Sequence, residues 1–486
     1  MAAGSAPGER WSRAAILLAL AFAGQAVILS VLRSGTSVDG AEQLVYTQVL
    51  DWGYGRSQPP LYTWLLIGVQ QVLGVSQIAE NALKFGLLLA GFLGIRALSM
   101  RLGHDGRVAT ATMMSLFAVV EIGLESQRNY AHSVLLFALM TWAAVLYLDI
   151  LRHGGGRRFA LLGIVSGLML LSKYNSALFL GALVAADLSM PRARALLRPQ
   201  AVLAVGIAAA IVTPHLVWAL SNADAVFALT AGFVPAAPEG AAGALRGAGL
   251  YLGATASLYL LVSLIAAAAF FLSGGRVSDI QRPVEAAPAL LSRWGLILWA
   301  LGLVVAMATA ATEVRMRWLV PVCVPLLPIV MGAALRGRPR ATALVLAAGV
   351  LLGVLSTSAQ WVESTRINPR TDYDYAALDA ALRDAGLPEP VIAPSYWVLA
   401  NLRLQAPRAF ATPEFPQAQH VVAKAGAATL LWEDGGDGAA TRDYARRLGF
   451  CPLPAARPRD FDLVRRHDGA PLRVSALAAS RAACTD

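Results

Sequence analysis

The chain has 486 residues, of which 57% are hydrophobic and only 14% are charged. Soluble domains carry about a quarter of charged residues, so this composition excludes a soluble protein and indicates an integral membrane protein. The net charge of +10 does not point to a nucleic-acid partner, because the arginines cluster in alternate connections between apolar runs, as at Arg152, Arg157 and Arg158. This alternation is the positive-inside pattern, and it predicts a cytoplasmic N-terminus.

The apolar runs predict eleven membrane helices. The first, residues 14–32, is long enough to cross a bilayer of about 30 Å. No small-x-small cleavage site follows it, so we interpret it as an uncleaved anchor. The fifth and sixth spans are short for a full crossing, which favours a bent pair joined at Ser172-Lys173-Tyr174-Asn175. The other predicted spans are residues 78–100, 107–124, 131–151, 159–172, 175–190, 200–220, 247–272, 294–311, 317–335 and 341–360.

The connection after the first span, residues 39–64, concentrates carboxylates, aromatics and turn formers. A helical reading from Ala41 puts apolar side chains on one side, which predicts an amphipathic helix on the membrane surface. Two glycines and the Pro59-Pro60 pair then break the chain before a second apolar piece, residues 61–73. Outer loops with such local order often carry function.

The chain after about residue 361 is more polar and contains no run long enough to span a membrane. We therefore expect two domains, a membrane domain over residues 1–360 and a soluble α/β domain over residues 361–486. With eleven spans before it, the soluble domain is predicted to lie outside the cytoplasm, in the periplasm of a Gram-negative cell. The membrane domain is predicted to lie in the inner membrane. Asp372 or Asp374 can cap the first helix of the soluble domain. Short strands are predicted at residues 391–393, 429–432 and 461–464.

The three cysteines share no metal-like spacing. Cys323 lies in an apolar run, whereas Cys451 and Cys484 fall in the outer domain. The last two can form a disulfide if that domain is extracytoplasmic, and the sequence leaves this pairing open.

Four segments carry a resemblance to a known group of enzymes. They are Asp39-x-Ala41-Glu42, Gly53-Tyr54 followed by Pro59-Pro60-Leu61-Tyr62-x-Trp64, Gly167-Leu168-x-Leu170-Leu171-Ser172-Lys173, and Pro214-His215-x-x-Trp218. Over residues 14–360 the chain resembles the polytopic glycosyltransferases of the C superfold (GT-C), which include protein O-mannosyltransferases and the lipid A aminoarabinose and galacturonic acid transferases. The resemblance implies a sugar donor on a polyprenyl phosphate, a cell-envelope acceptor such as lipopolysaccharide, and Asp39 as the catalytic base.

The sequence departs from the pattern of this group in three places. Gly40 stands where many relatives have Glu, which leaves Glu42 as the nearest carboxylate. Ser57-Gln58 precedes the proline pair where relatives often have an acidic residue followed by Lys or His. Ala131-His132-Ser133 occupies a place where relatives often carry Asp. These departures predict a subfamily with its own sugar or acceptor.

The same chemistry follows from the residues. A sugar esterified to phosphate through its anomeric carbon is already activated, so transfer to a hydroxyl needs a base, cations for the leaving phosphate and in-line placement. Asp39 can supply the base. The predicted topology puts the candidate donor-binding cations on the same outer side: Lys173, Arg128, Arg315 and Arg317. Neighbouring groups that we assign to the acceptor or to the pocket are Glu42, Tyr54, Gln58, Tyr62, Glu125, His132, Tyr174 and His215.

Each assignment has a simpler structural alternative. Asp39 could cap the helix that follows it. The basic side chains could reach to the membrane interface, and the aromatic ones could belong to the aromatic belt of the outer surface. His215, beside Pro214, could be a packed histidine. No cofactor is required by any spacing in the chain, and a divalent metal ion stays open.

Two other functions compete with an enzyme that transfers sugar to a lipid, glycan or protein acceptor. A transporter or flippase would also suit many spans with few intramembrane polar groups. Transporters, however, tend to show paired halves with broken helices and midplane charges, and we find no such duplication. A structural anchor for the outer domain would require neither eleven spans nor an ordered acidic loop.

Overall fold

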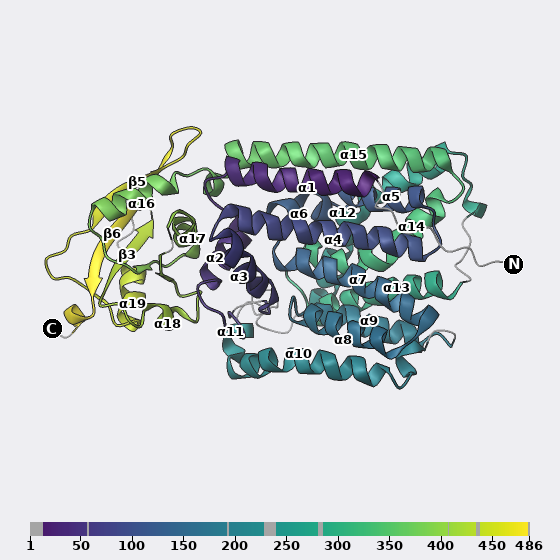
Figure 1. The fold of residues 1–486 in the computed structure, drawn as a ribbon, viewed down its shortest axis with the longest axis horizontal. Coiled ribbons are helices and arrows are strands. Elements are labelled where there is room, and N and C mark those ends of the chain that lie inside the picture. The colour runs from purple at the N-terminus through teal and green to yellow at the C-terminus, as the bar shows by residue number, and fades with distance from the viewer. Residues whose placement is uncertain are drawn as a thin grey trace.

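The computed structural model describes residues 13–55, 58–191, 194–227, 240–279, 285–406, 408–433 and 438–484. Figure 1 shows a bundle of long helices beside a smaller domain built on a β-sheet. Within the described residues, seven helices are long and apolar enough to cross a membrane by length and composition. They are α1 (Arg13–Leu32), α4 (Gln77–Arg101), α7 (His132–His153), α10 (Ala201–Ser221), α12 (Gly240–Leu272), α13 (Ala286–Ala308) and α15 (Pro339–Val362).

The helix positions agree with the predicted spans. The third predicted span is a pair of helical segments, Gly106–Ala118 and Glu121–Arg128, bent by 81°. Counted as one span, this pair would be an eighth crossing. The remaining three predicted spans coincide with shorter helices, so the total of eleven crossings stays a prediction: α8 (Gly156–Leu170), α9 (Ser176–Leu188) and α14 (Val320–Leu335).

Small residues let the bundle helices approach closely. Gly91 and Gly94 of α4 face Phe137 and Thr141 of α7, and a Cβ atom at either glycine would collide with the facing side chain. Small residues have this role at helix contacts in membranes, where van der Waals packing stabilises association. At the bend of the third span, Gly123 meets the backbone of Phe117 in the same way. The sharp bend thus depends on a residue without a side chain.

The C-terminal domain is a six-stranded mixed sheet with the strand order β2-β1-β3-β6-β4, and β5 also pairs with β6. The neighbours β1–β2 and β1–β3 are parallel, and the pairs with β6 are antiparallel. The predicted α/β class is correct, and the Asp374 side chain caps α16 by accepting from Ala377 N at 3.0 Å. The elements are α16 (Tyr375–Asp384), β1 (Val391–Ile392), α17 (Tyr396–Gln405), β2 (Phe410–Ala411), α18 (Ala418–Val422), β3 (Ala427–Glu433), α19 (Ala439–Arg447), β4 (Cys451–Pro452), β5 (Arg459–Val464) and β6 (Pro471–Ser480).

The first outer connection forms two short helices, α2 (Val38–Tyr46) and α3 (Leu61–Leu73). Both helices were predicted, but the part of the protein against which α2 packs was not. The apolar side of α2, with Leu44 and Val45, is buried in one hydrophobic core with Ile392, Ala400 and Phe415 of the C-terminal domain. The apolar side of α2 is therefore covered by the domain and not by lipid, and the position of α2 at the membrane surface stays a prediction. An amphipathic pattern specifies only that one side is covered, and here the domain covers it.

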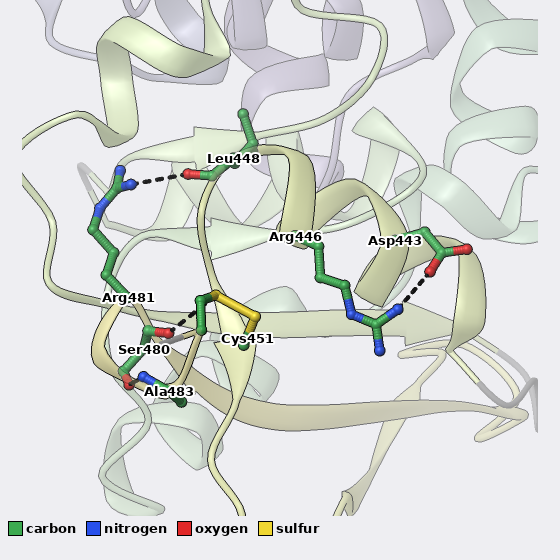
Figure 2. The surroundings of a disulfide bond; sticks show 8 residues. Asp443, Arg446, Leu448, Cys451, Ser480, Arg481 and Ala483 are labelled. Carbon is green, nitrogen blue, oxygen red and sulfur yellow. Dashed lines mark hydrogen bonds and ion pairs between the residues drawn. A yellow bond between two sulfur atoms is a disulfide. The ribbon is translucent and has the colours of Figure 1, made fainter. Parts of the chain in front are cut away.

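Cys451 and Cys484, which the sequence left open, form a disulfide across 33 residues of the C-terminal domain. Figure 2 shows it beside Ser480 and Arg481 at the end of β6. Cys323 is a free, buried thiol in α14.

Replacing both bonded cysteines by serine is expected to destabilise the C-terminal domain by about 2–4 kcal/mol, because the open chain of the variant has more conformational freedom when unfolded. Pulse proteolysis of the full-length protein in urea would measure this change. Reductant should lower the stability of the wild type to that of the variant and leave the variant unaffected. A wild-type domain insensitive to reductant would contradict the prediction.

Candidate active site

A cavity of about 420 Å³ lies where the first turn of α2 meets the bent third span and the loop before α14. Its lining combines one carboxylate of α2 with arginines that are nearly 280 residues away along the chain. The lining residues are Val38, Asp39, Glu121, Asn129, Tyr130, Val314, Arg315, Met316 and Arg317. The fold therefore brings three of the predicted site residues, Asp39, Arg315 and Arg317, to one hollow.

Asp39 is in the first turn of α2, and the backbone N–H of Ala131 donates a hydrogen bond to its side chain. Removal from water raises the pKa of Asp39 above its usual range, and the positive charges of Arg317 and Lys173 oppose this rise. No side-chain cap bond is formed at Ser37, the N-cap of this helix. The carboxylate lines the cavity with cations nearby, so it can act as a general base toward a hydroxyl group bound there.

Lys173 lies in the turn between α8 and α9 and is only 7% exposed. Its Nζ donates to Ser133 Oγ at 2.7 Å. Burial and, to a smaller extent, the charge of Arg317 lower the pKa of Lys173 to about 7, although the charge of Asp39 acts in the opposite direction. The guanidinium of Arg317 lies 5.1 Å from the ring centroid of Tyr130. One carboxylate and two cations thus come together from α2, the α8–α9 turn and the loop before α14.

For a catalytic site in which Asp39 is the base and Lys173 is a charged partner of the substrate, these pKa shifts predict a bell-shaped pH dependence of kcat/KM. Activity should fall as the pH decreases through the raised pKa of Asp39, because the base becomes protonated. It should also fall as the pH rises through about 7, because Lys173 loses its charge. Lys173→Arg is expected to remove the alkaline limb only, since guanidinium stays charged. An alkaline limb unchanged in this variant would contradict the prediction.

Arg128 and Glu125, two further predicted site residues, are engaged at the end of α15 instead. Arg128 Nε lies 2.6 Å from Glu363 Oε1, and its Nη1 lies 3.4 Å from Glu125 Oε1. Glu363 opens the helical turn η7 (Glu363–Ile367) that leads into the C-terminal domain. Arg128 therefore joins the bent third span to that turn. Arg315, by contrast, lines the cavity and is paired with Glu313 at 2.8 Å.

A second, narrow pocket is lined by Glu42, Gln58 and His132. Ser57 lies outside the described residues. The imidazole of His132 is held by Gln43 Nε2 at 3.1 Å and by the Ser172 carbonyl oxygen at 3.2 Å. Its ring centroid is 5.4 Å from that of Tyr62. Tyr62 and His132 thus connect α3 and α7 directly behind the Lys173 turn, where they can shape the site.

Tyr54, Tyr174 and His215 have structural contacts. The Tyr54 hydroxyl donates to the Val49 carbonyl at 2.8 Å, and its ring stacks on Tyr46. Tyr174 Oη lies 3.1 Å from His215 Nε2, and His215 Nδ1 lies 2.7 Å from the Trp52 carbonyl oxygen. His215 matches its alternative interpretation as a packed histidine, and it ties α10 to the loop after α2.

Glu80 and Lys84, one turn apart on α4, were missed by the sequence reasoning. Both are 7% exposed. A Cβ atom at Gly40 would lie 3.2 Å from Glu80 Oε2, so the Glu80 carboxylate lies beside the first turn of α2. The available signal was a pair of charges inside an otherwise apolar span, since such residues are rarely placed there without a function.

The described residues contain no group of three or more His, Cys, Asp or Glu side chains that could hold a metal ion.

Comparisons with known proteins give the class. A profile of the family "Dolichyl-phosphate-mannose-protein mannosyltransferase" matches residues 57–218. The structure resembles ArnT from Cupriavidus metallidurans bound to undecaprenyl phosphate, with a TM-score of 0.65, 12% identity, and coverage of 95% of this chain and 97% of ArnT. The chain has the GT-C fold, and it is a multi-pass membrane glycosyltransferase of the GT-C type.

Two relatives from Rhizobium johnstonii are similar over most of their length. The lipopolysaccharide core galacturonosyltransferase RgtA is 29% identical over 430 residues, covering 83% of this chain and 82% of RgtA. The lipopolysaccharide core galacturonosyltransferase RgtB is 28% identical over 409 residues, covering 80% of this chain and 81% of RgtB. These comparisons favour the enzyme over the transporter.

Proposed function

We propose that the protein transfers a sugar from a polyprenyl-phosphate donor to a lipid or glycan acceptor at the outer face of the inner membrane. The observation that carries this proposal is that Asp39 and Arg317 line one cavity, with the charge of buried Lys173 close enough to act on the Asp39 carboxyl. One base and two cations are the groups required by transfer from a glycosyl phosphate. The structure of ArnT with undecaprenyl phosphate supports a donor of this kind.

In the proposed reaction, the acceptor hydroxyl attacks the anomeric carbon of the donor sugar while Asp39 takes the hydroxyl proton. A new C–O bond forms at the anomeric carbon, and the bond from that carbon to the phosphate oxygen breaks. The bonding electrons leave with the polyprenyl phosphate. Lys173 and Arg317 stabilise the developing charge on that phosphate, and their effect is large because Lys173 is shielded from water.

We assign the cavity and the domain of residues 361–486 to the periplasm. The positive-inside distribution of arginines supports this side. The disulfide between Cys451 and Cys484 supports it as well, because disulfides persist in oxidising compartments such as the bacterial periplasm.

Lipopolysaccharide core and galacturonic acid are the acceptor and sugar to test first, since both curated relatives are galacturonosyltransferases of the lipopolysaccharide core. Mass spectrometry of lipopolysaccharide from cells with and without the protein should show the loss of one sugar increment. Purified protein in liposomes should then form a covalent product from a lipid-linked donor. Movement of a substrate across the liposome membrane without a covalent product would instead indicate a transporter.

A further inference from the structure

One helix of the C-terminal domain, α17, contacts both ends of the helix that carries Asp39. The polar contacts come from two of its residues, Asn401 and Arg403. Both side chains are buried, with 0% and 9% exposure. A buried polar group that loses its hydrogen-bond partner costs free energy. These two contacts are therefore both satisfied only when α2 is in one position relative to α17.

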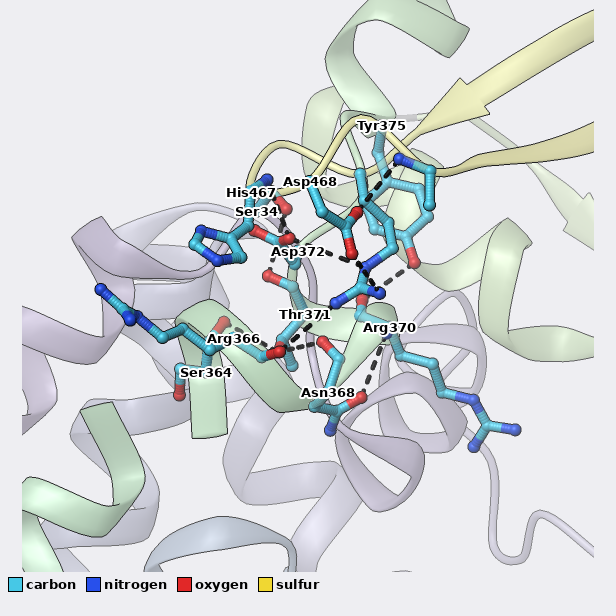
Figure 3. A network of polar contacts seen from close by, with 12 residues as sticks. Ser34, Ser364, Arg366, Asn368, Arg370, Thr371, Asp372, Tyr375, His467 and Asp468 are labelled. Carbon is cyan, nitrogen blue, oxygen red and sulfur yellow. Dashed lines mark hydrogen bonds and ion pairs between the residues drawn. The ribbon is translucent and has the colours of Figure 1, made fainter. Parts of the chain in front are cut away.

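The first contact is just before α2. The backbone N–H of Thr36 donates to Asn401 Oδ1 at 2.7 Å. The preceding Gly35 makes this approach possible, because a Cβ atom there would lie 2.9 Å from Asn401 Oδ1 and 2.6 Å from the Tyr375 ring. Figure 3 shows the polar network around this junction, in which Ser34 N donates to the Thr371 carbonyl at 3.0 Å. The segment leading into α2 is thus held against the domain.

The second contact is at the other end of α2. Arg403 Nη1 donates to Thr47 Oγ1 at 2.9 Å and to the Leu44 carbonyl, and its Nη2 lies 3.3 Å from the Thr47 carbonyl oxygen. The last carbonyl groups of a helix have no partner within the helix, and a planar guanidinium can satisfy several at once. Its positive charge also lies at the helix C-terminus, where it is favourable.

We propose that Asn401 and Arg403 are positioning residues of the active site, and that α17 orients Asp39 toward Lys173 and Arg317. Asp39 lies three residues after Thr36, within the first turn that Asn401 anchors. The two cations belong to the α8–α9 turn and to the loop before α14. A shift of α2 alone would therefore separate the base from the cations, and an error of about 1 Å at a reacting group can lower the rate about 100-fold.

This inference rests on the proposed role of Asp39, so its test needs a measurement that does not depend on catalysis. Hydrogen–deuterium exchange of the purified full-length protein reports the opening of α2 directly. In Asn401→Ala and Arg403→Ala we expect faster exchange of the amides in Val38–Tyr46, with the sheet unchanged. We also expect kcat to fall about 100-fold, with a donor KM close to that of the wild type because the cations do not move.

Matched variants complete the test. Asn401→Asp keeps an oxygen that accepts from Thr36 N but loses the amide that donates to the Trp397 carbonyl at 2.8 Å, so it should restore kcat in part, whereas Asn401→Leu should not. Arg446→Ala removes an exposed arginine of the same domain, paired with Asp443 at 3.1 Å, and should change neither exchange nor kcat. If an alanine variant does not fold, Arg403→Lys decides the question, because it keeps the charge but loses the planar fork and should give an intermediate kcat.

Three results would overturn the inference. The first is wild-type exchange of α2 and wild-type kcat in both alanine variants, and the second is wild-type kcat in Arg403→Lys. The third is faster exchange throughout the sheet together with a parallel loss of kcat and donor affinity, which would show a general loss of the domain. A further result would separate the two proposals. If the alanine variants exchange faster only in α2 and the Asp39→Asn variant is fully active, the role of Asp39 as the base is refuted, but the contact of α17 with α2 still stands.

Discussion

Asp39→Asn is expected to leave the protein folded in the membrane and to lower turnover by about 10²–10⁴-fold, the range that general-base catalysis contributes. The amide has nearly the same shape as the carboxylate and can still accept from Ala131 N, so the geometry of α2 should persist. It cannot take the proton of the acceptor hydroxyl at neutral pH. Binding of the donor should be preserved, because Lys173 and Arg317 remain in place.

The measurement is turnover of purified protein with a lipid-linked sugar donor, followed by mass spectrometry of the product. Asp279→Asn is a matched control, because it makes the same chemical change at an exposed residue between α12 and α13 that pairs with Arg338. Wild-type turnover in the Asp39→Asn protein would show that the base is another group.

Lys173→Ala is expected to raise the donor KM about 10- to 100-fold and to lower kcat as well, because the ammonium group contacts the donor phosphate and stabilises the charge that develops on it. A hydrogen bond to a charged group contributes about 1.5–3 kcal/mol, and the loss of one such bond to the donor phosphate accounts for this range. Because Lys173 is buried at the site, water cannot replace its ammonium group easily. The variant also loses one of the cations that oppose the raised pKa of Asp39, so its acid limb should move to higher pH.

Two further variants serve as comparisons for Lys173→Ala. Ser133→Ala removes the oxygen that accepts from Nζ but keeps the charge, so its effect on donor KM should be smaller. Lys424→Ala removes an exposed lysine of the C-terminal domain and should have no effect. A donor dependence identical to that of the wild type in Lys173→Ala would exclude this residue from the donor site.

Sequence reasoning located the helices well, because a membrane helix is a local feature. A run of apolar residues long enough to cross the bilayer can be recognised from its own sequence, because its length and composition do not depend on the rest of the chain. The same holds for the N-cap at Asp374 and for the strand of residues 427–433, which depend on short-range patterns. The side of the membrane on which Asp39, Lys173 and Arg317 lie was likewise predicted from the charge of nearby connections.

Only the tertiary structure decided which of these groups meet. The predicted side of the membrane is the same for Arg317 and Arg128, so it could not tell which of them lies at the site. Arg317 lines the cavity with Asp39, whereas Arg128 is paired with Glu363. The amphipathic pattern of α2 could not identify its partner either, since a lipid surface and a protein core select the same apolar side. Contacts between residues hundreds of positions apart depend on how the whole chain packs, and local periodicity contains no information about them.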